Sequence, residues 1–256
     1  MLRSNFLRLG LIFLFRFFIK KKMKAIEMKK QKLYFLSGTM CTPLLWNGTV
    51  AELTQFNCIF VDTTSETSFS EIDILLDATL EENAFVVAFS MGAYAAMHFA
   101  VSNPKRIQKM IVIAASANGL SSTELQLRKN TIDFLEKHNY KGISTARALQ
   151  FLHPQQHQNN ELIQVIKDMD ADLGKEVLIR QLKATSQRVD LTQKLQQIQA
   201  KVHVIAAKED ALVNIEDVKH TQQQFAKATI SILKNCGHMI PLEMPDLVKE
   251  SVFRFS

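Results

Sequence analysis

The sequence predicts an α/β protein in which helices flank a mostly parallel sheet and a helical segment interrupts the order of the strands. Short apolar runs typical of strands occur between residues 32 and 114 and again between residues 202 and 233. Helical patterns separate these runs, and such alternation is typical of parallel sheets. The stretch 120–199 has no convincing strand, and this predicts the inserted segment.

The predicted strands are continuous apolar runs rather than alternating ones, which indicates strands covered on both faces. They are Lys32–Leu36, Cys58–Val61, Ala84–Phe89, Met110–Ala114, Val202–Ala206 and Thr229–Leu233. The helices predicted between and after them are Thr49–Gln55, Ser70–Leu80, Met91–Val101, Ile215–Phe225 and Asp246–Phe253.

The domain organisation follows from this interruption. Residues 28–119 and 200–256 are expected to form the core, and residues 120–199 a helical cap. The cap segment has periodic apolar positions, and His153-Pro154 marks a break between its helices. An insertion at the carboxyl edge of a parallel sheet would cover the place where such sheets bind ligands.

Composition and charge limit the classes of function. The chain has 256 residues, 47% hydrophobic and 22% charged, which suits one large domain with a buried core and excludes a disordered protein. Its net charge of +6 arises in residues 1–27, which hold seven Lys or Arg and one acidic residue. The remainder is balanced, so no nucleic-acid partner is predicted for the folded body.

The first 27 residues form a basic and apolar extension. Its apolar run, Leu9–Ile19, is interrupted by Arg16 and has about half the length of a membrane-spanning helix, so no stable membrane span is expected. We expect the extension to be disordered or untranslated, with translation starting at Met23 or Met28. The alternative is a short interfacial anchor with a basic flank.

The three cysteines indicate the cellular compartment, and the absence of known binding motifs indicates which cofactors to expect. Cys41, Cys58 and Cys236 cannot all pair and lack zinc-ligand spacing, so reduced thiols and a cytoplasmic location are expected. The sequence contains no dinucleotide-binding glycine pattern, no phosphate-binding loop motif and no H-E-x-x-H metal motif. We therefore expect no cofactor and no metal site.

The strongest chemical signal is Ser90 in Ala88-Phe89-Ser90-Met91-Gly92, between a predicted strand and a predicted helix. A serine on a sharp strand-to-helix turn exposes its hydroxyl, and small residues two positions before and after it let the backbones pass closely. The Met91 amide, at the helix start, is expected to face a tetrahedral oxyanion. The alternative is a serine that only caps the helix.

A serine nucleophile needs a base, and histidine suits neutral pH. Of seven histidines, His238 is the candidate because it follows the last strand on a loop with Gly237 that can reach the sheet's carboxyl edge. The others are expected to be structural or solvated: His98, His138, His153, His157, His203 and His220.

A third residue should orient the imidazole. Asp210 follows the strand Val202–Ala206 on a loop at the same edge, and Glu209 is its rival. Asp62, after Cys58–Val61, is a more distant candidate. The spacing alone does not separate Asp210 from Glu209.

The second oxyanion donor is expected in the loop after the first core strand, where Gly38 leads a turn. Either Thr39 or Met40 would supply the amide, although an ordinary glycine turn is the alternative. Met40 and Trp46 are also candidates for contacts with substrate.

Together these residues resemble the α/β-hydrolase superfamily, in the branch with a helical cap, over residues 32–253. The Ala88–Gly92 stretch is similar to its G-x-S-x-G elbow, which implies Ser90 as nucleophile. Ala207–Asp210 is similar to its G-x-x-D and implies Asp210 rather than Glu209. Gly237-His238 is similar to the G-H near the C-terminus.

The first turn completes the resemblance. Ser37-Gly38-Thr39 stands where the superfamily has H-G-x, which implies Thr39 as the second donor. The segment 36–46 is similar to that of many small bacterial members, which implies a carboxylesterase-like enzyme. Ala88 and Ala207 replace glycines, and the stretch after Asp62 lacks glycines common there, so the loops beside the site differ.

A Ser–His–Asp set with two amide donors implies hydrolysis of a carboxylic ester through an acyl-enzyme on Ser90. Within the resemblance, the substrate is a small or medium acyl ester, with a pimeloyl-carrier methyl ester or a lactone as narrower choices. An acidic acyl carrier protein would need a basic cap face. The residues that could supply it are Arg128, Lys129, Lys137, Lys141, Arg147, Lys183 and Arg188.

Two other classes of function are alternatives to an ester hydrolase. One is a lyase or C–C bond hydrolase that uses the same triad, and the other is a non-catalytic binding member of the superfamily.

Overall fold

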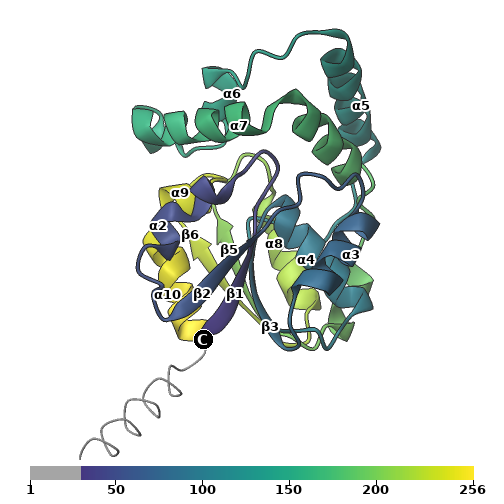
Figure 1. The fold of residues 1–256 in the computed structure, drawn as a ribbon, viewed down its shortest axis with the longest axis vertical. Coiled ribbons are helices and arrows are strands. Elements are labelled where there is room, and N and C mark those ends of the chain that lie inside the picture. Colours follow the sequence, from purple (N-terminus) through teal and green to yellow (C-terminus); the bar gives the residue numbers. More distant parts are fainter. Residues whose placement is uncertain (1–29) are drawn as a thin grey trace, which may run out of the picture. The chain divides into compact units, whose positions relative to one another are not determined.

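The computed structural model describes residues 30–256, and the compact unit considered below runs from Lys32 to Ser256. Within these residues six strands form one sheet in the order β2-β1-β3-β4-β5-β6 (Figure 1). The strands are β1 (Gln31–Leu36), β2 (Phe56–Val61), β3 (Ala84–Phe89), β4 (Ile107–Ile113), β5 (Lys201–Ala207) and β6 (Ala228–Leu233). The six strands predicted from the sequence are confirmed, with boundaries shifted by at most three residues.

Parallel pairing runs from β1 through β3, β4 and β5 to β6. All six residues of β3 are buried, because this strand lies inside the sheet and has helices on both of its faces. An unbroken apolar run is the pattern expected of such a strand. All these strands therefore end at the same edge of the sheet, where the loops that follow them meet.

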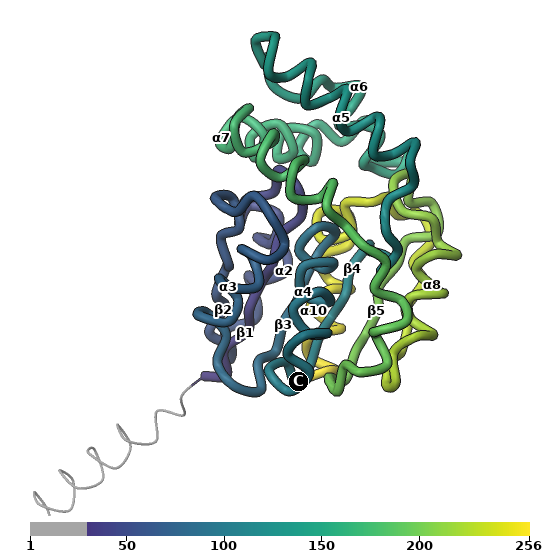
Figure 2. Tube along the Cα trace, turned by 90° about the vertical axis from the view of Figure 1, so that its right-hand side faces the viewer, coloured from purple at the N-terminus to yellow at the C-terminus, as the bar shows by residue number. Residues whose placement is uncertain are grey.

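Helices cover both faces of the sheet (Figures 1 and 2). The helices of the core are α2 (Asn47–Val50), α3 (Phe69–Thr79), α4 (Met91–Ser102), α8 (Ile215–Gln224), α9 (Ile240–Glu243) and α10 (Pro245–Phe255). Two apolar clusters result. The first apolar cluster lies between one face of the sheet and helices α3, α4 and α8. The second lies on the opposite face and includes Trp46 and side chains of α10. Successive residues of β1 alternate between them, with Tyr34 in the first and Phe35 in the second, as the two-residue period of a strand requires.

The segment between β4 and β5 contains helices joined by loops and no strand, and it lies over the carboxyl edge of the sheet (Figures 1 and 2). It contains α5 (Ser122–Lys137), α6 (Thr145–Leu149), α7 (Asn160–Thr185) and the short 3-10 helices η2 (Pro154–Gln156) and η3 (Thr192–Gln197). A kink divides α7 at Gly174, whose φ is 70°. We call the expected range, residues 120–199, the cap.

One predicted helix is wrong. The sequence predicts a helix over Thr49–Gln55, but α2 ends at Val50 and residues 51–55 lead through turns into β2. The Leu53 N–H donates to Val50 O, and the Phe56 N–H donates to Leu53 O, so tight turns replace the helix. The physical reason is that Leu53 and Phe56 must be buried close to the start of β2, which leaves no room for another helical turn.

The expectations for residues 1–27 lie outside the described residues. In the part of the chain that the structure describes, no helix combines the length and apolar character needed to cross a membrane.

Candidate active site

Ser90 occupies a strained turn between β3 and α4. Its φ is 50° and its ψ is −114°, a conformation that is unfavourable for any residue with a side chain. The turn is held because the Ser90 N–H donates to Ile113 O of β4 at 2.9 Å. The Ser90 side chain makes no hydrogen bond that caps α4, so its hydroxyl is available for another role.

Glycine at position 92 allows the elbow to approach the end of β1. A Cβ at Gly92 would lie 2.5 Å from Ser37 O and 2.6 Å from Leu36 O, closer than real Cβ atoms come to backbone oxygens. The turn after β1 also comes close to the elbow at Gly38, where a Cβ would lie 2.9 Å from the Phe89 ring and 3.2 Å from Ser90 Cβ. The turn after β1 and the serine elbow are therefore direct neighbours.

The structure brings Ser90, His238 and Asp210 together. His238 Nε2 lies 3.1 Å from Ser90 Oγ, and His238 Nδ1 lies 2.8 Å from Asp210 Oδ2. The His238 and Asp210 side chains are only 6% and 3% exposed, so water competes little for these contacts. The second carboxylate oxygen of Asp210 accepts hydrogen bonds from the Leu212 and Val213 N–H groups, which fixes its orientation.

The rival carboxylates have other partners. Glu209 accepts a hydrogen bond from the Asn235 N–H, and Asp62 accepts one from the Thr64 N–H. Four of the other histidines also have hydrogen-bond partners. His98 pairs with Asp73 and His203 contacts Thr229, while His153 and His157 bond backbone groups close to them in the chain. The geometry therefore favours Asp210 over Glu209 as the residue that orients the imidazole.

The two candidates for the second oxyanion donor differ in their bonding. The Met40 N–H donates to Gln181 Oε1 at 2.8 Å, so this amide is occupied. Among the described residues, the Thr39 N–H and the Met91 N–H donate to no protein group. Of the alternatives that the sequence left open, Thr39 is therefore the amide that remains free beside the elbow.

Trp46 does not face the site, contrary to the expectation that it contacts substrate. Its side chain is 0% exposed, packs on Phe35 with ring centroids 5.0 Å apart, and donates from Nε1 to Ser37 Oγ at 2.9 Å. Met40 is partly exposed and keeps an accessible surface. Trp46 thus supports the turn after β1 from inside the core, because its large ring fills the second apolar cluster.

The arrangement has the parts of a nucleophilic site. A hydroxyl within reach of an imidazole, itself oriented by a buried carboxylate, can lose its proton as it attacks an electrophile. Two free amides beside it can stabilise a developing oxyanion. In residues 30–256, no group of three or more His, Cys, Asp or Glu side chains is placed to hold a metal ion.

Comparison with known families gives a match over most of the chain. The model of the Ndr family matches residues 70–256, a range that contains Ser90, Asp210 and His238. The chain belongs to the Ndr family. The matched range begins after the turn at residues 37–41, so the family match covers the elbow and the His238 loop but not the Thr39 amide.

Solved structures show that this Ndr-family chain has the α/β-hydrolase fold. It is similar to a thermophilic esterase from Thermogutta terrifontis, with 16% identity, a TM-score of 0.77 and 88% of each chain covered. It is also similar to the enol-lactonase from Burkholderia xenovorans LB400, with 16% identity, a TM-score of 0.74 and coverage of 88% of this chain and 90% of that one.

A curated relative is the 2-hydroxy-6-oxo-6-phenylhexa-2,4-dienoate hydrolase of Comamonas testosteroni. The two are 26% identical over 178 residues, which is 67% of this chain. The match spans 62% of the relative's length.

Two polar residues near the site carry no motif in the sequence and were not predicted. One is Gln181 of α7, which binds the Met40 N–H. The other is Glu243 of α9, whose carboxylate accepts from the Gly237 N–H at 3.0 Å and from the His153 N–H at 2.8 Å. Burial raises the pKa of Glu243 above its ordinary value. Only the fold brings these side chains to their partners, so no local spacing could have identified them.

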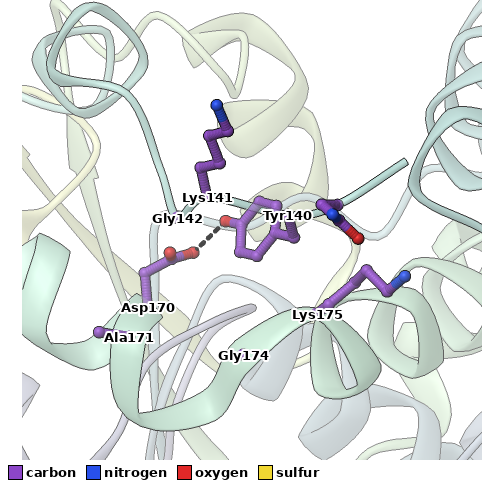
Figure 3. A pocket seen from close by; sticks show the side chains of 8 residues that line it. Tyr140, Lys141, Gly142, Asp170, Ala171, Gly174 and Lys175 are labelled. Carbon is purple, nitrogen blue, oxygen red and sulfur yellow. Dashed lines mark hydrogen bonds between the residues drawn. The ribbon is translucent and has the colours of Figure 1, made fainter.

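A separate hollow of about 490 Å³ lies within the cap, and none of the predicted site residues lines it. Figure 3 shows the residues that do. Tyr140 donates a hydrogen bond to Asp170 there, and Lys141 and Lys175 also line it. Asp170 Oδ2 accepts from the Ile143 N–H at 2.8 Å, so its carboxylate fastens the loop after α5 to α7. The buried carboxylate of Asp170 is therefore explained by its structural hydrogen bonds to Tyr140 and Ile143.

Proposed function

We propose that the protein is a serine hydrolase that cleaves carboxylic esters of small or medium acyl groups through an acyl-enzyme on Ser90. The observation that carries this proposal is the 3.1 Å contact between His238 Nε2 and Ser90 Oγ. In the proposal Ser90 is the nucleophile, His238 the general base and Asp210 the residue that orients His238. Thr39 and Met91 supply the oxyanion hole.

The chemistry follows from these roles. Ser90 Oγ attacks the ester carbonyl carbon while His238 Nε2 takes the hydroxyl proton, and the carbonyl oxygen becomes an oxyanion that accepts from the two amides. The intermediate collapses with loss of the alcohol, which receives the proton from His238. Water then attacks the acyl-enzyme, passing a proton to His238, and the acid leaves as Ser90 recovers its proton.

The substrate is proposed only as a class. The cap would supply the acyl pocket, and a pimeloyl-carrier methyl ester or a lactone are narrower candidates. Of the basic residues considered for an acidic carrier protein, Arg188 is engaged elsewhere, because its Nη2 donates to Ser116 O and Asn118 O. Lys129, Lys137, Lys141, Arg147 and Lys183 are exposed. Lys183 pairs with Glu136, so the other four are the residues that a carrier surface would use.

A fluorophosphonate probe tests the nucleophile. The wild-type protein should be labelled, and Ser90→Ala should not be labelled although it folds. A series of p-nitrophenyl esters with acyl chains of two to twelve carbons then tests the esterase claim, with turnover expected at the shorter lengths. If the wild-type protein is not labelled and hydrolyses none of these esters, the proposal is wrong and a non-catalytic binding role replaces it.

A C–C bond hydrolase is the second candidate. It is favoured by the similarity to the Comamonas testosteroni enzyme, whose name describes hydrolysis of a dienoate. The same serine and histidine would serve that reaction. Labelling of Ser90 without turnover of any ester, together with turnover of a vinylogous diketone acid, would decide for this candidate over the esterase.

A further inference from the structure

Gln181 links the cap to the turn that would form the oxyanion hole. It lies on α7, is 2% exposed, and accepts the Met40 N–H with its Oε1 at 2.8 Å. Because a backbone N–H can only donate, the side-chain atom that faces it must be the oxygen, which fixes the orientation of the amide. The bond joins residues 141 positions apart.

The turn that Gln181 holds is strained. The Cys41 N–H donates to Gly38 O at 3.2 Å and closes a four-residue turn, in which Met40 has a φ of 55°. A methionine in this left-handed region costs roughly 1–2 kcal/mol, and such a conformation persists only when its surroundings impose it. The bond from Met40 to Gln181 is one such constraint, and it acts on the peptide unit that follows Thr39.

We propose that Gln181 is a positioning residue for the hydrolytic reaction, holding the Thr39–Met40 peptide so that the Thr39 N–H points at the developing oxyanion. The proposal rests on the proposed function, because it assigns Gln181 a role in that same site. Thr39 donates to no described protein group and lies one peptide unit from the bond that Gln181 makes. If the donor N–H moves away by a fraction of an ångström, it stabilises the oxyanion much less, because the strength of such hydrogen bonds depends steeply on distance and angle.

A neighbouring residue provides a matched control. Arg180, on the same helix, also joins the cap to the core, because its Nε donates to Thr64 O at 2.9 Å. That bond reaches the loop after β2 and not the turn at residues 38–41. If Gln181 only fastened the cap, loss of either bond should have the same effect.

The experiment compares the wild-type protein, Gln181→Met and Arg180→Met. Methionine has nearly the volume of glutamine but no comparable acceptor, so it removes the bond to the Met40 N–H without a large cavity. The measurements are kcat and KM on a short p-nitrophenyl ester, the thermal midpoint, and the inhibition constant of a trifluoromethyl ketone with the same acyl chain. This ketone adds to the serine and leaves an oxyanion like that of the intermediate.

The expected result is a fall in kcat of about 10- to 100-fold for Gln181→Met, with KM changed by less than about threefold. The inhibition constant should rise by the same factor as kcat/KM falls, because inhibitor and transition state use the same amides. Arg180→Met should keep kcat and the inhibition constant within about twofold of wild type, even if its thermal midpoint falls.

Several results would overturn the proposal. One is a kcat for Gln181→Met within twofold of wild type, and another is an equal loss in both variants. A loss of kcat with an unchanged inhibition constant would also exclude the role. If Gln181→Met does not fold, Gln181→Ala is measured instead. If neither Gln181 variant folds but Arg180→Met does, the bond between the Met40 N–H and Gln181 is purely structural and the proposal is wrong. An inactive, unlabelled wild-type protein refutes the proposed function itself, whereas active wild type with an unaffected Gln181→Met refutes only this inference.

Discussion

His238 Nε2 lies 3.1 Å from Ser90 Oγ although the two residues are 148 positions apart in the sequence. Both follow strands of the same parallel sheet, Ser90 after β3 and His238 after β6, and parallel strands end at one edge. The contact is therefore a product of topology. Four predictions concern the groups that hold these two side chains in place and the fold around them.

The first concerns the carboxylate that orients His238. Asp210→Asn should lower kcat by about 10⁴-fold, because an amide can favour the wrong imidazole tautomer and no longer stabilises the imidazolium. The overall fold should persist, since Asn can still accept from the Leu212 and Val213 N–H groups. Steady-state ester hydrolysis checks this result. Glu209→Gln is the control and should stay within about threefold of wild type, whereas equal losses would mean that Asp210 is wrongly assigned.

The second concerns the close approach at Gly92. Replacing a helical glycine with alanine normally stabilises a protein by about 0.5–1 kcal/mol. Here the new Cβ would meet Ser37 O at 2.5 Å, so Gly92→Ala should instead lower the free energy of unfolding by about 1–3 kcal/mol. Because α4 must shift and carry Ser90 with it, kcat should also fall at least tenfold.

Urea denaturation and ester hydrolysis test the Gly92 prediction. Gly119→Ala is the comparison, since its nearest contact is Asp190 N at 3.1 Å and it lies outside the elbow. Its loss of stability should be smaller and its kcat nearly unchanged. A neutral or stabilising Gly92→Ala would show that the elbow has more room than the structure gives it.

The third prediction concerns Glu243, which holds the His238 loop against the cap. Glu243→Ala leaves the Gly237 and His153 N–H groups without their acceptor and should lower the free energy of unfolding by about 1–3 kcal/mol. It should also lower kcat, because the loop that carries His238 loses an anchor. The control is Glu250→Ala, an exposed partner of Arg254, which should change stability by less than about 0.5 kcal/mol. Similar losses in the two variants would contradict this account.

The fourth concerns pH and His203. Burial, followed by the proximity of Arg254, lowers the pKa of His203 below its ordinary value of 6.5. As the pH falls below 6.5, the unfolded chain binds a proton that the folded protein resists, so the free energy of unfolding should fall until the lowered pKa is reached.

Denaturation at pH 7 and pH 5 checks the His203 prediction. The wild-type protein should lose more stability between these values than His203→Gln does. His138→Gln, at an exposed position of the cap, serves as the control and should behave like wild type. An identical loss in wild type and His203→Gln would exclude a contribution from this imidazole.

The sequence predicted the fold well because the signals are local. An unbroken apolar run such as Ala84–Phe89, flanked by helical patterns, is typical of a strand buried on both faces, and the structure has that strand with the same bounds. The helix predicted at Thr49–Gln55 failed because its end depends on where Leu53 and Phe56 must be buried, which is not a local property.

The sequence by itself determined the six strands, the serine elbow and the order in which Ser90, Asp210 and His238 follow one another, since each depends on residue types close together in the chain. Only the tertiary structure shows that Asp210 and not Glu209 contacts His238, that the Met40 amide is bonded to Gln181, and that Trp46 is buried. It alone also revealed Gln181 and Glu243. The physical reason is that neighbouring residues on a loop have the same local pattern but point in different directions, and direction is set by packing against parts of the chain that are distant in sequence.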